Sequence, residues 1–210
     1  MRKIGIFGGT FDPIHYGHLR PALEILDALR LDCMYFIPAG RPPHRGAPVA
    51  SAELRLAMVK AAVREEPRFQ VDERELRRAG PSYMVDTLTD LRREFPRDAL
   101  LLVLGADAFL GLPAWHRWRE IFDLAHVVAA HRPGWTLDAG GELADVMRAR
   151  LAKDARASLS VPAGAVLLQQ VTQLEISSTQ LRRDAAAGRD LRYLVPEAVR
   201  ALIRDSDCYR

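Results

Sequence analysis

Short apolar runs alternate along the chain with segments in which apolar residues recur every three or four positions. The apolar runs predict strands at residues 3–7, 34–37, 69–71, 100–104, 125–130 and 165–171. The helical spacing predicts helices at residues 17–30, 51–63, 82–95, 178–187 and 197–204, with Ser51 and Ser82 as N-caps. This alternation predicts an α/β fold with a doubly wound parallel sheet, in which the run at 100–104 is central.

The length of the chain favours one domain. With 210 residues, 49% of them apolar, it can bury a substantial core. Nothing in the sequence marks a linker, so we expect a single domain over residues 1–210 with a small helical subdomain at 177–210. Residues 38–50 hold four prolines and two glycines, which predicts a loop able to move over a ligand.

The charge, apolar pattern and cysteine content indicate which partners and which cellular location to expect. The 30 basic and 27 acidic residues leave a net charge of +3, which does not imply a nucleic-acid partner. No apolar run approaches the roughly 20 residues that a membrane helix needs. Cys33 and Cys208 show no Cys-x-x-Cys spacing. We therefore expect a soluble, cytoplasmic protein without a membrane partner, and its oligomeric state stays open.

A glycine-rich loop follows the first predicted strand and opens the first predicted helix. Gly8, Gly9 and Thr10 let the backbone approach a phosphate, and a helix N-terminus favours an anion. His15 and His18 lie three residues apart in the first helical turn, where both can face that anion. The absence of Gly-x-Gly-x-x-Gly disfavours a Rossmann dinucleotide site. A zinc site is disfavoured because no Cys or acidic ligands with suitable spacing accompany the histidines.

A second polar segment, Ile176-Ser177-Ser178-Thr179-Gln180-Leu181-Arg182, opens a predicted helix near the other end of the chain. Its hydroxyl groups could simply cap the helix. Arg182, one turn further on, places a guanidinium beside the free N–H groups of the helix start. That combination predicts a phosphate pocket.

Both segments resemble sequence motifs of a known superfamily. Residues 8–18 resemble the signature of the nucleotidyltransferase superfamily with its His-x-Gly-His motif, and residues 177–182 resemble its Ser-Ser-Thr-x-x-Arg motif. The resemblance implies one ATP site, with His15, His18 and Arg182 as catalytic residues and no metal ligand from the protein. The implied ATP-binding residues are Gly8, Gly9, Thr10, Phe11, His15, His18, Gly105, Asp107, Ile176, Ser177, Ser178, Thr179 and Arg182.

Shorter motifs narrow the resemblance to one family. The stretches that carry it are Pro42-Pro43-His44-Arg45, Pro81-Ser82-Tyr83 with Asp86-Thr87-Leu88, Gly105-Ala106-Asp107, Leu112-Pro113-x-Trp115 and Arg132-Pro133. Together they are similar to bacterial nicotinate-nucleotide adenylyltransferases. The implied mononucleotide-binding residues are Thr10, His44, Arg45, Ser82, Tyr83, Thr87, Trp115 and Arg132. The chain departs from the family at Arg45, where Lys is frequent, and at Met84-Val85, where Thr-Ile is common.

The resemblance implies transfer of AMP from ATP to nicotinate mononucleotide, giving nicotinate adenine dinucleotide (deamido-NAD) and pyrophosphate, a step of NAD biosynthesis. Mg²⁺ would enter bound to the ATP phosphates. Trp115 would stack on the pyridine ring, although a tryptophan can equally be a core residue. Two alternatives stay open: transfer to another acceptor such as phosphopantetheine, and a module that binds ATP without turnover. Preference for the acid or the amide mononucleotide also stays open.

Overall fold

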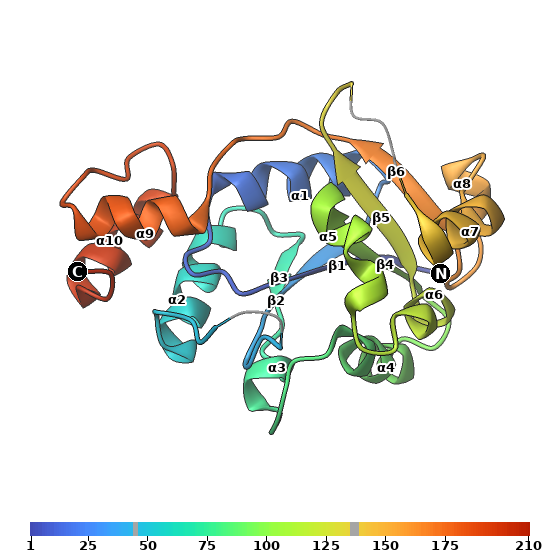
Figure 1. Ribbon diagram of the computed structural model, residues 1–210, viewed down its shortest axis with the longest axis horizontal. Helices are drawn as coiled ribbons and strands as arrows, with labels where there is room; N and C mark the ends of the chain where they lie inside the picture. The colour runs from blue at the N-terminus through green and yellow to red at the C-terminus, as the bar shows by residue number, and fades with distance from the viewer. Residues whose placement is uncertain (44–45, 135–138) are drawn as a thin grey trace. The chain divides into compact units, whose positions relative to one another are not determined.

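The computed structural model describes residues 1–43, 46–134 and 139–210 (Figure 1). Six parallel strands form one sheet in the order β3-β2-β1-β4-β5-β6. The strands are β1 (Lys3–Gly9), β2 (Cys33–Pro38), β3 (Phe69–Val71), β4 (Ala99–Gly105), β5 (His126–His131) and β6 (Val166–Gln170). The predicted strands and the parallel α/β sheet are confirmed.

The predicted central strand is the most completely buried. In β4, the side chains from Ala99 to Leu104 are at most 6% exposed. Ile4 of β1 lies opposite Leu100 of β4, and Leu102 of β4 lies opposite Val127 of β5. A strand that is buried on both faces reads as a continuous apolar run. This burial explains why residues 100–104 could be identified from the sequence alone.

The five predicted helices are all present. They are α1 (Tyr16–Ala28), α2 (Ala52–Val63), α4 (Met84–Glu94), α9 (Ser178–Ala186) and α10 (Glu197–Ser206). The sequence analysis missed α3 (Arg74–Arg77), α5 (Ala106–Leu110), α6 (Ile121–Leu124), α7 (Gly141–Arg150), α8 (Ala155–Ser158) and the 3-10 turns η1 (Leu112–Ala114) and η2 (Trp118–Glu120). Except for α7, each has five residues or fewer, which is too short to show a helical period.

One of the two predicted N-caps is correct. The Ser51 hydroxyl accepts a hydrogen bond from Leu54 N at 3.2 Å, as expected of a helix cap. The prediction for Ser82 is wrong, because Tyr83 occupies the cap position of α4. The Ser82 hydroxyl instead accepts hydrogen bonds from Gly40 N at 2.9 Å and Arg41 N at 3.1 Å. A contact so distant in sequence leaves no local signal.

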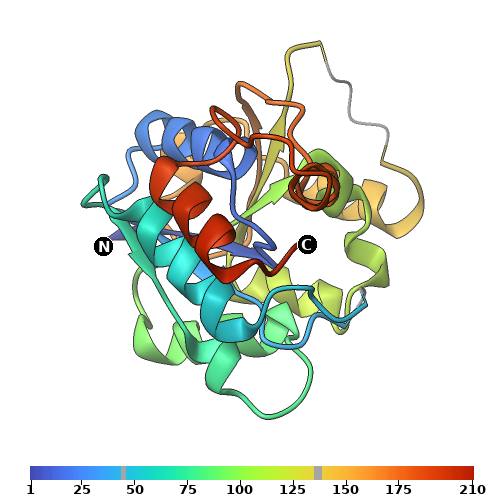
Figure 2. The ribbon, with the colours of Figure 1, turned by 90° about the vertical axis from the view of Figure 1, so that its left-hand side faces the viewer.

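The chain divides into two compact units, and the boundary passes through β1, α1 and β2. The first unit contains residues 1–7, 22–34 and 83–172, and the second contains residues 8–21, 35–82 and 173–210. A single domain with a helical part at 177–210 stays a prediction. In the first unit α4 packs against α6. In the second, α10 packs against α2, and these helices lie side by side in Figure 2.

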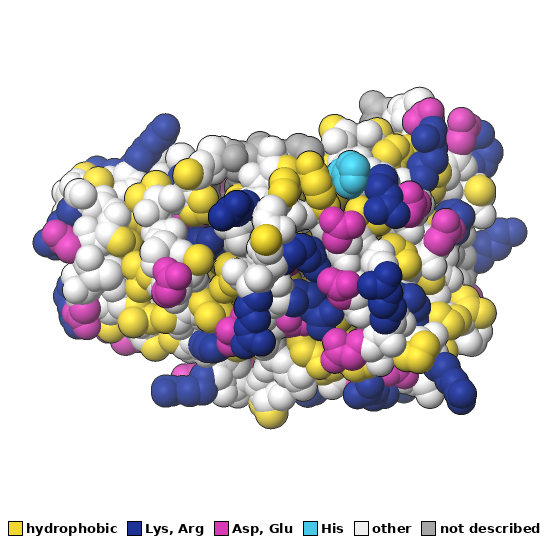
Figure 3. Space-filling model, turned by 90° about the horizontal axis from the view of Figure 1, so that it is seen from below, with side chains coloured by type: hydrophobic (Ala, Val, Ile, Leu, Met, Phe, Trp, Pro, Cys, Tyr) yellow, Lys and Arg dark blue, Asp and Glu magenta, His cyan; other side chains and the backbone are white. Residues whose placement is uncertain are grey.

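Surface charges of both signs are intermingled. In the face that Figure 3 shows, Lys and Arg side chains alternate with Asp and Glu rather than forming one basic area. Exposed charges also form ion pairs, for example Arg148 with Asp145 at 2.7 Å and Arg119 with Glu142. No helix within the described residues has both the length and the apolar character of a membrane span.

Candidate active site

In the second unit, the backbone of the loop after β1 is constrained by close packing and hydrogen bonds. Phe11 adopts a left-handed conformation with φ 49°, which is uncommon for a residue with a side chain. Its ring leaves space only for glycine at position 9, because a Cβ there would come within 2.9 Å of two Phe11 ring carbons. The loop is also bonded to the chain after β2, since Ala39 N donates to Gly9 O at 2.9 Å. These contacts fix the path of residues 8–12.

The two predicted catalytic histidines lie against each other. Their ring centroids are 3.8 Å apart, and His15 N donates a hydrogen bond to His18 Nδ1 at 3.3 Å. The Phe11 ring meets the His18 ring edge-on at 5.3 Å. Burial lowers the pKa of His15 to about 4, so His15 is neutral at neutral pH. Its Nδ1 is buried and has no hydrogen-bond partner among the described residues.

Gly17, between the histidines, is required by the packing of His15. A Cβ at this position would lie 2.9 Å from His15 Nδ1 and 3.3 Å from the backbone oxygen of Leu174. The backbone atom cannot give way as a flexible side chain can. The glycine of the His-x-Gly-His motif therefore makes room for the buried imidazole.

The two predicted ATP motifs, more than 150 residues apart, meet in the second unit. Ser178 Oγ donates a hydrogen bond to Pro13 O at 3.0 Å. Arg182 Nη1 donates to Asp12 O at 2.7 Å, and Arg182 Nη2 donates to Thr179 Oγ1 at 3.3 Å. Ser177 occupies the cap position of α9 without a side-chain cap bond. The hydroxyl groups of Ser178 and Thr179 therefore join the two motifs and hold Arg182.

Two buried charged residues, Asp12 and Arg55, fix the loop after β1 through hydrogen bonds. The sequence predicted a role for neither. The Asp12 carboxylate accepts hydrogen bonds from Val49 N at 2.8 Å, Ala50 N at 3.1 Å and Tyr209 Oη at 2.7 Å. Arg55 is 1% exposed, and its Nη1 donates to the carbonyl oxygens of Thr10 and Ala39 at 2.8 and 2.7 Å. Burial lowers the pKa of Arg55. Arg55 could have been found, because it shares the spacing of the buried Val59 and Val63.

Other predicted site residues belong to the first unit. Gly105 ends β4 as the cap residue of α5, and Asp107 is exposed in the first turn of α5. Trp115 is half-buried, whereas Trp118 is a core residue at 6% exposure. Arg132 is exposed just after β5. The predicted contacts from His44 and Arg45 lie outside the described residues.

Tyr83 and Thr87 differ in what they can offer to a ligand. The Tyr83 ring packs against the His116 ring at 4.3 Å, a partner that sequence reasoning missed although it follows Trp115 directly. Thr87 is fully buried in α4, and its N–H donates to Tyr83 O at 3.3 Å. The first N–H groups of α4 lack partners inside the helix. The helix start, rather than the Thr87 side chain, is therefore the part suited to an anion.

The described residues offer no metal-binding cluster of their own. Among the described residues, no group of three or more His, Cys, Asp or Glu side chains could hold a metal ion. A divalent ion carried on ATP phosphates needs no such group, since it takes oxygen ligands from phosphate and water. The described residues are therefore compatible with a metal that enters bound to the nucleotide.

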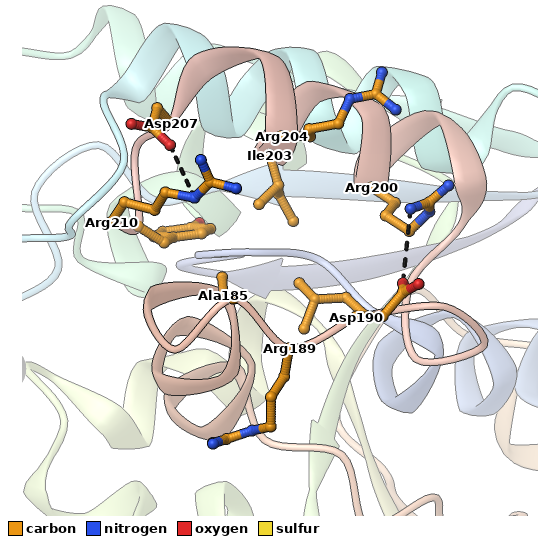
Figure 4. A pocket seen from close by; sticks show the side chains of 11 residues that line it. Ala185, Arg189, Asp190, Arg200, Ile203, Arg204, Asp207 and Arg210 are labelled. Carbon is orange, nitrogen blue, oxygen red and sulfur yellow. Dashed lines mark ion pairs between the residues drawn. The ribbon is translucent and has the colours of Figure 1, made fainter.

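A pocket of about 230 Å³ lies in the second unit between α9, α10 and the residues that follow each helix (Figure 4). None of the predicted site residues that the structure describes lines it. Its arginines are paired with carboxylates, as the dashed lines between Arg200 and Asp190 and between Arg210 and Asp207 show. Arg189 and Arg204 pair with Asp184 and Asp205. The positive charge of the pocket is compensated, so it does not favour an anion.

Comparisons with known proteins agree with the motifs. A cytidylyltransferase-like family model matches residues 6–184. A relative from Halorhodospira halophila, described as "Probable nicotinate-nucleotide adenylyltransferase", is 49% identical over 100% of this chain and 96% of its own. One from Methylococcus capsulatus with the same description is 46% identical over 98% of this chain and 99% of its own. The chain belongs to the nicotinate-nucleotide adenylyltransferase family.

Solved structures extend the likeness to the fold of the family. Nicotinic acid mononucleotide adenylyltransferase from Plasmodium falciparum, complexed with NaAD, superposes with a TM-score of 0.72 at 15% identity, covering 100% of this chain and 98% of that one. The same enzyme complexed with APC gives the same values. Membership of the adenylyltransferase family confirms the enzyme class that the motifs predict, which is nucleotidyl transfer.

Proposed function

We propose that the protein transfers AMP from ATP to nicotinate mononucleotide, giving nicotinate adenine dinucleotide and pyrophosphate in NAD biosynthesis. The observation that carries the proposal is the junction of the two motifs, in which Ser178 and Arg182 donate hydrogen bonds to the backbone of the loop that leads to His15 and His18. The descriptions of its full-length relatives support the same reaction.

ATP binds to the second unit in this proposal. The backbone at Gly8, Gly9 and Thr10 and the hydroxyl groups of residues 177–179 surround the phosphates, and Arg182 adds a positive charge. His15 is neutral at neutral pH because of its burial. It therefore acts as a hydrogen-bond donor to phosphate oxygen and not as a cation.

For the mononucleotide, the first unit offers an aromatic side chain, a helix N-terminus and an arginine. Trp115 is half-buried and offers its indole face to the pyridine ring. The N-terminus of α4, beside Tyr83, suits the nicotinate carboxylate, which accepts hydrogen bonds from free N–H groups. Arg132, exposed after β5, supplies charge for the mononucleotide phosphate.

The reaction needs alignment more than acid or base catalysis. A phosphate oxygen of the mononucleotide forms a bond to the α-phosphorus of ATP, and the bond from that phosphorus to the β-phosphate oxygen breaks with release of pyrophosphate. The attacking phosphate is already ionised at neutral pH, so no general base is required. The imidazoles and Arg182 offset the charge that develops at phosphorus. Mg²⁺ bound to the ATP phosphates would neutralise part of the same charge.

The free thiols and the surface charge support a cellular location for the enzyme. Cys33 and Cys208 are both free thiols, which suits the reducing cytoplasm. Intermingled surface charge supports small nucleotides rather than nucleic acid as substrates. We place the enzyme in the cytoplasm on these grounds.

Product analysis tests the proposal. The enzyme is incubated with MgATP and, separately, nicotinate mononucleotide, nicotinamide mononucleotide or phosphopantetheine, and pyrophosphate and dinucleotide products are measured. We expect the highest kcat/KM with nicotinate mononucleotide. Preferred turnover of phosphopantetheine would assign another acceptor. ATP binding without pyrophosphate release from any acceptor would indicate a binding module instead.

A further inference from the structure

The Asp12 carboxylate is the point at which separate segments of the second unit are joined. It is buried, with the residue 3% exposed, and accepts hydrogen bonds from Val49 N, Ala50 N and Tyr209 Oη. Arg182 Nη1 lies 3.8 Å from its Oδ2. A buried carboxylate is stable only when such partners satisfy its oxygens. The position of the Asp12 carboxylate therefore depends on all of these partners.

Tyr209, in the segment after α10, supplies the side-chain hydroxyl of this set. It is 6% exposed, and its Oη lies 2.7 Å from Asp12 Oδ1. Burial and the adjacent carboxylate raise the pKa of Tyr209 far above its usual range, so the hydroxyl keeps its proton and donates. A hydrogen bond from a hydroxyl to a carboxylate is among the stronger kinds in proteins.

The backbone of the same aspartate is held by the second ATP motif. Arg182 Nη1 donates to Asp12 O, and Ser178 Oγ donates to the next carbonyl, Pro13 O. Two residues further on the loop reaches His15. Asp12 therefore has its side chain fixed by Tyr209 and its backbone fixed by Arg182, and any rotation of Asp12 would move both motifs.

We propose that Tyr209 is a positioning residue for adenylyl transfer: its hydroxyl fixes Asp12, and through Asp12 it holds the histidine loop and Arg182 in the arrangement that receives the ATP phosphates. Tyr209 itself touches no reacting atom. The inference rests on the proposed function and adds to it a residue outside both motifs.

The direct test is Tyr209→Phe, which removes only the hydroxyl. We expect kcat/KM for ATP to fall by about 10-fold, as when one hydrogen bond to a charged group is lost, while KM for nicotinate mononucleotide stays within about 2-fold. The matched control is Tyr193→Phe, because Tyr193 lies in the same unit and is 88% exposed. That control should retain wild-type kinetics. Wild-type kinetics in a folded Tyr209→Phe protein would overturn the proposal.

A double-mutant cycle separates positioning from general stabilisation. If Tyr209 acts through Asp12, then Tyr209→Phe should change kcat/KM little in an Asp12→Ala background, since both acceptor oxygens have already been lost. A purely structural role would lower the melting temperature and leave kcat/KM for ATP unchanged well below that temperature. Additive losses of kcat/KM in the double variant would contradict action through Asp12.

Hydrogen exchange on the wild-type protein provides a test that does not depend on the folding of Tyr209→Phe. Val49 N and Ala50 N donate to the Asp12 carboxylate, so MgATP should slow exchange of both amides if ATP binding tightens this set. The amide of Asp72, which donates to Phe36 O in the same unit, is the reference. Equal exchange with and without MgATP would refute the coupling.

Failure of this inference can be told from failure of the proposed function. A wild-type enzyme that makes no dinucleotide from ATP and nicotinate mononucleotide would refute the proposed function, without reference to any variant. An active wild type alongside an unaffected Tyr209→Phe would refute only the role of Tyr209.

Discussion

The imidazole rings of His15 and His18 lie with their centroids 3.8 Å apart, and the N–H of His15 donates to Nδ1 of His18 at 3.3 Å. This bond holds the His18 ring through its Nδ1 atom. Because burial keeps His15 neutral, the pair does not carry two positive charges that would repel each other. The histidines therefore suit hydrogen bonding to phosphate oxygen.

Replacing His18 should remove one preorganised donor. His18→Ala should lower kcat on the order of 10²-fold or more, while the melting temperature stays close to that of the wild type. His18→Gln keeps an N–H donor and should recover part of the loss. Steady-state pyrophosphate release measures both, and a folded His18→Ala enzyme with wild-type turnover would exclude the role.

Stability should fall in acid because of His15. The folded-state pKa is about 4 against an ordinary value of 6.5, so the unfolded state binds a proton first as the pH falls. The contribution of His15 to the free energy of unfolding is complete above pH 6.5. It decreases by up to about 3 kcal/mol as the pH falls to about 4.

Urea unfolding of the wild type and of His15→Gln across this pH range isolates that term. The pKa of His126 is also lowered by burial, but His126 is present in both proteins and cancels in the difference. Parallel stability curves for the two proteins from pH 7 to pH 4 would show that His15 is not held neutral.

Trp115 should matter for the mononucleotide rather than for ATP. Trp115→Ala removes the proposed stacking surface, so calorimetry should show weaker binding of nicotinate mononucleotide and little change for ATP. Trp118→Ala is the contrasting variant, because Trp118 is buried against Phe122 with ring centroids 6.1 Å apart. It should cost about 3–5 kcal/mol of stability. A larger loss of ATP affinity than of mononucleotide affinity in Trp115→Ala would reject stacking.

Arg55 should be required for the stability of the loop. Its Nη1 bonds to the carbonyl oxygens of Thr10 and Ala39, and Arg55→Met leaves both oxygens without that donor. We expect a loss of roughly 2–4 kcal/mol in urea unfolding, since each unsatisfied buried polar group costs about 1–3 kcal/mol. Arg204→Met, on an exposed arginine of α10, is the control and should change stability little. Equal stability of the two variants would contradict this role.

The sequence predicted the features that depend on neighbouring residues. Continuous apolar runs marked the buried strands, and apolar spacing marked α1 and α4. Glycines next to paired histidines and a serine-rich turn before Arg182 marked the two motifs that the structure brings together. Spacing within one segment was enough in each of these cases.

Apart from the meeting of the two motifs, which the family resemblance implied, contacts between distant segments were not predictable. Ser82 looked like a cap, but its hydroxyl accepts from Gly40 N and Arg41 N. Nothing near Tyr209 indicates that its hydroxyl reaches Asp12 across the fold. The fully buried Thr87 looked available to a ligand because burial depends on packing that its neighbours in sequence do not reveal.

Tracing the α-phosphorus of ATP is the most direct measurement of adenylyl transfer. ATP labelled at the α-phosphate is mixed with Mg²⁺, nicotinate mononucleotide and the enzyme, and the label is followed into products and protein. We predict that all transferred label appears in the dinucleotide, that none is bound covalently to protein, and that His18→Ala slows its appearance on the order of 10²-fold. Label retained on the protein, or ATP left intact beside nicotinate mononucleotide, would contradict the account.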